Sequence, residues 1–156
     1  MHLYSKIFPP LIALALALVA INSADVVRKW WEGSGPAIEW HGVEVLTHTV
    51  RPGGKLEIVY TATIHRQCQA DLRSFVVAPD ETVPIRFPVV SGGYAQPSPD
   101  PVRIKVSITI PLQSDPGLSP LQSGAHTYRT VATRYCPQGV ETDNKIPDAK
   151  FAMEVP

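Results

Sequence analysis

Cys68 and Cys136 are the two cysteines of the chain, and they carry the most specific chemistry that the sequence offers. Each shares its parity along an alternating segment with an apolar residue, Ile64 or Ala132, that is expected to face a core. A disulfide between them would close a loop of about 68 residues and stabilise the fold by roughly 4 kcal/mol. We expect this bond, bridging two sheets, and with it an oxidising compartment. The alternative is a pair of buried thiols in a cytosolic domain.

Histidines near these cysteines raise the question of a metal site. His65 and Cys68 form a His-x-x-Cys pair, but short zinc motifs pair their ligands more tightly, and a regular strand turns the two side chains to opposite faces. A blue-copper site needs two histidines and a methionine around a cysteine, and no histidine stands near Cys136 in the usual loop pattern to join Met153. We therefore predict structural cysteines, surface histidines, no metal and no cofactor.

Catalytic motifs are not recognisable. The serines fall in turns, and none lies in a Gly-x-Ser-x-Gly elbow. Several acidic residues near the cysteines could offer oxygens to calcium, but they lack EF-hand spacing, and solvated loop acids are the simpler interpretation. These residues are Asp71, Glu141, Asp143 and Asp148. We predict a non-catalytic protein, and an enzyme with a site in the loops near the disulfide remains the alternative.

The apolar run from Ile7 to Ile21 decides the expected location of the protein. Alone it spans about 15 residues, which is short for a membrane span and fits the core of a secretory signal preceded by Lys6. A helix from Pro10 to Trp31 would be about 33 Å long, enough to cross a bilayer. We predict a membrane anchor helix over residues 1–31. The alternative is a cleaved signal peptide, for which a cut after Ala24 is a poor match.

The end of this helix carries Arg28, Lys29, Trp30 and Trp31, which we expect at the membrane interface. Tryptophan rings favour headgroup depth, and long basic side chains reach lipid phosphates. Positive charge lies on both sides of the apolar run, so charge does not fix the orientation. The predicted disulfide does, because it places the C-terminal domain on the periplasmic side of the inner membrane.

The remaining sequence predicts strands. After a linker over residues 32–36, segments of period two alternate with turns, and Val, Ile and Thr are frequent. Pro84 and Pro88 fall on the outward parity of one segment, which predicts an edge strand. The predicted strands are 37–47, 55–68, 72–78, 83–90, 102–110, 126–136 and 150–155. Their number and spacing predict a seven-stranded antiparallel, immunoglobulin-like sandwich over residues 37–156, with a Greek-key barrel as the alternative.

In this topology the second and sixth strands end at the same end of the sandwich, where the chain also arrives from the anchor. The disulfide end is therefore expected to face the membrane, and the opposite end to carry the turn at 51–55 and the loop at 111–124. If the domain binds something distant from the bilayer, this opposite end is the favoured place. The candidate partner-binding residues there are Arg51, Lys55, Asp115, Leu118 and Leu121.

The charge composition of the chain argues against nucleic acid as a binding partner. The chain has 14 basic and 14 acidic residues and a formal net charge of zero, so no basic patch indicates nucleic acid. We expect a membrane-anchored binding or accessory module whose partners are the lipid bilayer and a protein. A secreted binding domain with a cleaved signal is the alternative.

The segment Val50–Tyr60 (VRPGGKLEIVY) is similar to the second strand of many bacterial immunoglobulin-like modules. Together with the N-terminal run, Gly33-Ser34-Gly35-Pro36 and the closing Phe151–Val155, it resembles uncharacterised single-pass membrane proteins of bacteria and their phages. This resemblance implies a role in the cell envelope or in a phage-encoded assembly. It assigns a functional role to no residue of this chain.

Overall fold

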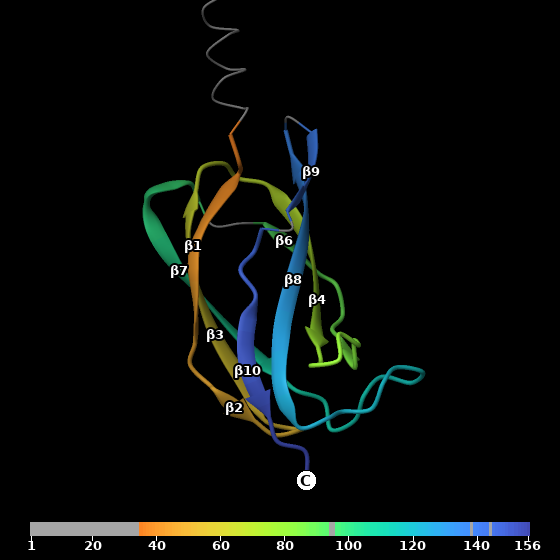
Figure 1. Ribbon diagram of the computed structural model, residues 1–156. Helices are drawn as coiled ribbons and strands as arrows, with labels where there is room; N and C mark the ends of the chain where they lie inside the picture. Colours follow the sequence, from red (N-terminus) through yellow and green to blue (C-terminus); the bar gives the residue numbers. More distant parts are fainter. Residues whose placement is uncertain (1–34, 94–95, 138, 144) are drawn as a thin grey trace, which may run out of the picture. The chain divides into compact units, whose positions relative to one another are not determined.

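The computed structural model describes residues 35–93, 96–137, 139–143 and 145–156, which form β-strands and the loops between them (Figure 1). Residues 37–156 make one compact unit. The described part of the chain is therefore all-β, as the alternation in the sequence predicts.

The predicted anchor helix over residues 1–31, with Arg28, Lys29, Trp30 and Trp31, lies outside the described residues. Within the described ranges, no helix has the length and apolar character needed to cross a membrane.

Two sheets pack face to face in a sandwich-like arrangement. The smaller sheet has the order β1 (Ile38–Val45), β3 (Lys55–Ile64) and β7 (Ser98–Thr109). The larger sheet has the order β2 (Thr49–Val50), β10 (Ala149–Met153), β8 (Gly124–Cys136), β4 (Gln69–Val77) and β5 (Ile85–Arg86). In addition, β6 (Val90–Gly93) pairs with β4, and β9 (Gly139–Asp143) pairs with β8. Thus β4 has β8 along one edge, and β5 and β6 in succession along the other.

Alternate residues of both sheets fill the shared interior, because successive side chains of a strand point to opposite faces. In β3, alternate residues of the predicted strand 55–68 are buried as a period of two requires, and these residues are Leu56, Ile58, Tyr60, Ala62 and Ile64. The main core cluster joins this strand to residues of the larger sheet, among them Val76, Tyr128, Phe151 and Met153. The alternate apolar residues of β7 pack on the core but stay half-exposed, since β7 borders only β3; they are Val102, Ile104, Val106 and Ile108.

The sandwich differs from the prediction in strand number and direction. The described residues form ten strands instead of seven, and β9 occupies part of the predicted loop after Cys136. The larger sheet is mixed instead of wholly antiparallel, because β2 and β10 run parallel with Thr49 opposite Ala152. In β1 the register shifts between Trp40 and Gly42, and this bulge explains the imperfect alternation of that segment.

The predicted edge strand at 83–90 is confirmed as an edge but is broken into β5 and β6. Pro88 is exposed between them. Pro84, expected to face outward, is fully buried. The reason is the loop after β7: the backbone N–H of Asp115 donates a hydrogen bond to the Pro84 carbonyl at 3.2 Å, so this loop lies against the start of β5.

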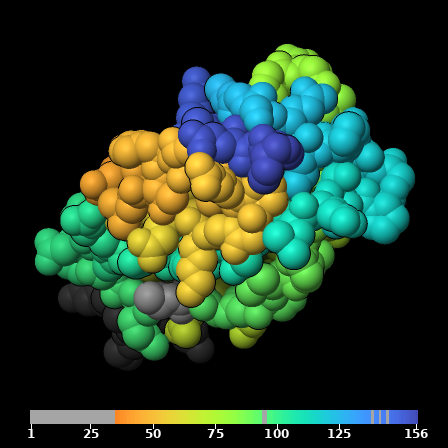
Figure 2. Space-filling view, turned by 90° about the horizontal axis from the view of Figure 1, so that it is seen from below, coloured from red at the N-terminus to blue at the C-terminus, as the bar shows by residue number. Residues whose placement is uncertain are grey.

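The two ends of the sandwich hold the segments that the topology predicts. At the disulfide end, which holds Cys68 and Cys136, the N–H of His65 donates to the carbonyl of Ala37, just before β1. At the opposite, distal end, the N–H of Gly53 donates to the carbonyl of Ile110. Figure 2 views the distal end, where the blue C-terminal residues lie between the orange-yellow segment around β2 and the cyan start of β8. The chain therefore enters the domain at one end and finishes at the other.

Candidate binding surface

The predicted disulfide is present between Cys68 and Cys136, which lie 68 residues apart in the sequence. Its place in the fold differs from the expected bridge between sheets. The β4–β8 ladder sets Gln69 opposite Tyr135, so Cys68 and Cys136 continue the same register at the end of two neighbouring strands. The reason is that β3 ends at Ile64, and the chain crosses to the larger sheet before it reaches Cys68. The bond therefore joins β4 to β8 within one sheet.

A buried ion pair lies between the sheets. Arg134 of β8 and Asp143 of β9 form it, and their side chains are only 3% and 8% exposed. Asp143 also accepts a hydrogen bond from the indole N–H of Trp40 at 2.9 Å and one from the backbone N–H of Lys145 at 2.9 Å. Since Trp40 belongs to the smaller sheet, this carboxylate links the two sheets and has a structural part, not that of a calcium-binding loop acid.

The described histidines do not form a metal site. Within the described residues, no group of three or more histidine, cysteine, aspartate or glutamate side chains is placed to hold a metal ion. His65 is exposed, as predicted, and pairs with Glu39 at 3.3 Å. The prediction of surface histidines is wrong for His126, which is 1% exposed, with its Nδ1 hydrogen-bonded to the Gly124 carbonyl and its ring packed near Phe151.

The predicted partner-binding residues lie at or near the distal end, but no contact among them is observed in the described residues, and several of them hold the domain together. Arg51 is exposed and pairs with Glu154 at 3.3 Å. Lys55 is exposed at the start of β3, and Leu118 is half-buried. Leu121 packs against the core. Asp115 accepts a hydrogen bond from the backbone N–H of Arg86 at 2.9 Å and thereby fixes the loop to β5.

The strongest candidate for a binding site lies beside that loop, on the edge of the larger sheet. A surface hollow of about 510 Å³ is lined by residues of β4, β5 and their neighbours. We call it the β4 groove, and its lining residues are Arg73, Ser74, Phe75, Val83, Arg86, Phe87 and Val89. Apolar and aromatic side chains with a few charged groups are typical of binding sites.

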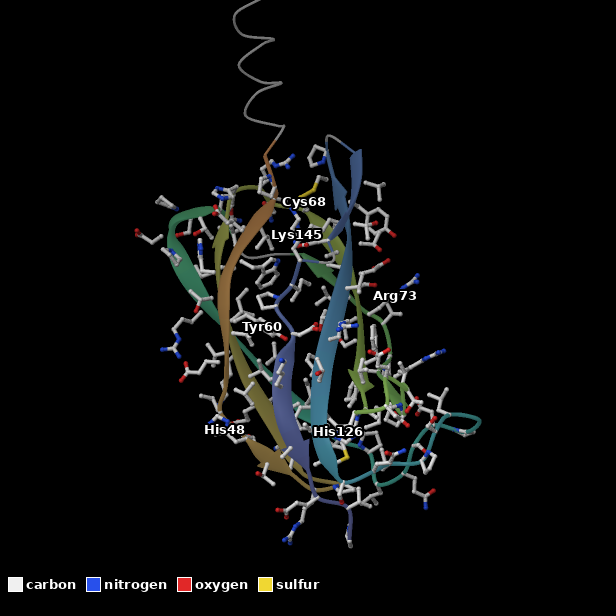
Figure 3. All side chains as sticks on the ribbon, in the orientation of Figure 1. His48, Tyr60, Cys68, Arg73, His126 and Lys145 are labelled. Atoms are coloured by element: carbon white, nitrogen blue, oxygen red, sulfur yellow. A yellow bond between two sulfur atoms is a disulfide. The ribbon has the colours of Figure 1, made fainter. Side chains whose placement is uncertain are left out.

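The strand register explains how the β4 groove forms. Phe75 stands opposite Arg86, and Leu72 stands opposite Val90, so the chain between β5 and β6 leaves the ladder beside Arg73 and Ser74. Phe87 turns inward and packs edge-to-face on Tyr128, with ring centroids 5.9 Å apart. Figure 3 shows Arg73 on the outer side of the larger sheet, whereas Tyr60 lies between the sheets.

Sequence reasoning missed this groove, although two signals were present. Arg73 and Phe75 have the outward parity of β4, and Arg86 stands between Phe87 and the inward Ile85. Val89, assigned to the core by alternation, is 54% exposed because it follows Pro88 in the break between β5 and β6. Only the pairing of β4 with β5 shows that these residues meet.

A second hollow, of about 440 Å³, lies beside the disulfide and includes Gln67, Gln69 and Tyr135 among its lining residues. The nearby Asp71 accepts hydrogen bonds from the hydroxyls of Ser91 and Tyr135. The hydrogen bond to Asp71 raises the pKa of the exposed Tyr135. These contacts hold β6 and β8 to β4, and they give Asp71 a structural part.

Comparisons with known proteins leave the family open. No protein-family model matches the chain, and no curated protein matches its sequence. Among solved structures, the alkylpurine DNA glycosylase AlkC of Pseudomonas fluorescens aligns with a TM-score of 0.45 and 10% identity, covering 77% of this chain and 31% of that one. The sporulation control protein Spo0M of Bacillus subtilis aligns with a TM-score of 0.43 and 15% identity, covering 77% and 50%.

A CARDB domain from Pyrococcus furiosus aligns with a TM-score of 0.38 and 12% identity, covering 79% of this chain and 90% of that one. This chain spans about a third of the AlkC chain and half of the Spo0M chain. At these TM-scores the likenesses carry no information about what this chain binds.

Proposed function

We propose that this chain is a non-catalytic binding module, an immunoglobulin-like sandwich held on the periplasmic side of the inner membrane by the helix predicted over residues 1–31. It binds a protein of the envelope or of a phage-encoded assembly. The observation that carries the binding role is the β4 groove, in which Arg73 and Arg86 lie beside apolar and aromatic side chains and form no ion pair with a described residue.

Two further features support a binding module that is held at the membrane. The described chain begins at the disulfide end, whereas the β4 groove adjoins the loop that leads to the distal end. Within the domain, the groove therefore lies away from the residues at which the chain enters β1. The disulfide itself supports the periplasmic location, since such bonds persist in oxidising compartments.

Site-specific cross-linking in cells tests the binding role. A photo-reactive amino acid at Val89 is expected to yield one discrete cross-linked protein, because Val89 is exposed in the groove. The same group at Ser107, exposed on β7 of the other sheet, is the matched control and should not yield it. The cross-link should disappear in the Arg73→Gln, Arg86→Gln double variant. Equal cross-linking from Val89 and Ser107, or a product that ignores the double substitution, would contradict the proposal.

A further inference from the structure

The arginines of the β4 groove differ from four other described arginines in how their charge is neutralised. Arg51, Arg103, Arg129 and Arg134 each pair with a carboxylate of this chain, as does Lys105. Arg73 and Arg86 form no ion pair with a described residue. Since the guanidinium group is always charged and matches a carboxylate with two parallel hydrogen bonds, these two side chains are available to an external carboxylate.

Two acidic residues near the groove, Asp71 and Asp115, are engaged by other groups. Both carboxylate oxygens of Asp71 accept hydrogen bonds, one from Ser91 and one from Tyr135. Asp115 accepts the backbone N–H of Arg86 and forms no ion pair with its guanidinium. The two carboxylates therefore flank the arginines without neutralising them by contact. Since Asp71 and Asp115 stand beside the two arginines, their charges offset the field that would attract a densely charged polyanion such as nucleic acid or an anionic membrane surface. Two carboxylates of a peptide can still pair with the two guanidinium groups by direct contact.

The spacing of the two arginines fits an extended peptide. Phe75 stands opposite Arg86, and Arg73 is two positions before Phe75 on the same face of β4, so Arg73 and Arg86 are diagonal neighbours. Such neighbours lie about 7–8 Å apart. Alternate side chains of an extended strand lie about 6.5–7 Å apart on one face. Two acidic residues at alternate positions of an extended segment would therefore meet both arginines.

We propose that the β4 groove binds an extended acidic segment of a protein, with carboxylates at alternate positions and apolar side chains between or beside them. The apolar part lies against Phe75, Val83 and Val89, and the carboxylates pair with Arg73 and Arg86. This inference rests on the proposed binding function and names the chemistry of its partner.

Peptide binding to the full-length chain in phosphatidylcholine nanodiscs tests the inference. The probe is a short synthetic peptide that alternates glutamate and valine, and the matched peptide has glutamine for each glutamate. We expect the glutamate peptide to bind at least about 10-fold more tightly and to lose affinity as salt is raised, because charge-assisted hydrogen bonds carry the difference. Arg73→Gln and Arg86→Gln should each weaken binding by roughly 10-fold. Arg103→Gln, which removes an ion-paired arginine on the other sheet, should change it less than about 2-fold.

Several results would overturn the inference: equal binding of the two peptides, equal binding by the arginine variants, or tighter binding of an oligonucleotide or of anionic vesicles. The cross-linking experiment separates this failure from that of the function. If Val89 still cross-links a partner in an arginine-dependent way while the glutamate peptide does not bind, the acidic segment is wrong and the binding module stands. If both experiments fail, both proposals fall.

Discussion

Asp143 shows how strongly the cost of a single carboxylate depends on burial. It is the buried partner of Arg134 and the acceptor of the Trp40 indole N–H, so it satisfies groups from both sheets. A second arginine–aspartate pair from the same strand, Arg129 with Asp148, has side chains that are much more exposed. The two pairs share chemistry and differ in solvation, which makes each the control for the other.

Asp143→Asn is expected to lower the free energy of unfolding by about 3–5 kcal/mol, because it removes the carboxylate charge that faces the buried Arg134 guanidinium. Asp148→Asn should cost at most about 1 kcal/mol, since exposed pairs contribute little. Urea unfolding of the full chain in detergent micelles, followed by tryptophan fluorescence, measures both. Equal losses in the two variants would show that burial does not govern these pairs.

The buried Tyr60 should make the free energy of unfolding depend on pH in the alkaline range. Burial raises the pKa of Tyr60, and the neighbouring Tyr128 and Asp148 add to the effect. Because the pKa is raised in the folded state, the folded chain keeps this proton where the unfolded chain releases it. Tyr60 therefore makes its full contribution to the free energy of unfolding below the ordinary tyrosine pKa of about 10, and this contribution is lost as the pH rises above that value.

The free energy of unfolding should fall more steeply above pH 10 in the wild-type chain than in Tyr60→Phe, which lacks the titrating group. Below that pH the two proteins should have similar stability, since the Tyr60 hydroxyl is buried and makes no hydrogen bond of good geometry with a described residue. Unfolding measured at a series of pH values tests this. Parallel curves for the two proteins would rule out Tyr60 as the source of the slope.

At the scale of the elements, the disulfide cross-links the paired strands β4 and β8. Cys68 and Cys136 extend the β4–β8 register at the end where the chain enters from β3. A break there would free the end of the strand that carries Arg73 and Phe75. The groove therefore depends on an element that is held covalently at one end and by backbone pairing along its length.

Removing the disulfide should destabilise the fold by about 4 kcal/mol, because the bond closes a loop with a sequence separation of 68. The Cys68→Ser, Cys136→Ser double variant and the reduced wild-type chain should lose similar amounts in urea unfolding. The oxidised wild-type chain is the reference. A loss below about 1 kcal/mol in both would mean that the unfolded state is not constrained as the loop length predicts.

At the scale of the whole molecule, the predicted location of the domain rests on the N-terminal apolar run and on the disulfide. The apolar run Ile7–Ile21 predicts the anchor, and the disulfide supports an oxidising side. Membrane fractionation tests the predicted anchor, and thiol labelling tests the disulfide. We expect the chain at its full mass in the membrane fraction, resistant to alkaline carbonate washing, and its cysteines unreactive to thiol reagents without reductant.

A shortened chain in the soluble periplasmic fraction would instead indicate the cleaved-signal alternative. A soluble cytosolic chain with reactive thiols would contradict both the anchor and the periplasmic location. The buried pair of Arg134 and Asp143 gives an independent check of folding in each fraction, since Asp143→Asn should lower the recovered amount of folded domain.

The sequence alone determined which residues face the interior along a regular strand such as β3. Leu56, Ile58 and Tyr60 of β3 are buried as their alternation predicts, because a period of two assigns each side chain to one face of a sheet whatever its neighbours are. The disulfide could be predicted because the chain has two cysteines, whereas the parity argument for Cys68 fails, since β3 ends at Ile64 before the chain reaches Cys68.

Only the tertiary structure decided which strands are neighbours. Alternation carries no information about pairing partners, so the parallel contact of β2 with β10 and the place of the disulfide within one sheet could not be predicted. The β4 groove likewise depends on which strands are neighbours, so alternation could not predict it. Arg73 and Arg86 are ordinary outward residues in the sequence, and they become a pair because the β4–β5 register sets Arg86 opposite Phe75.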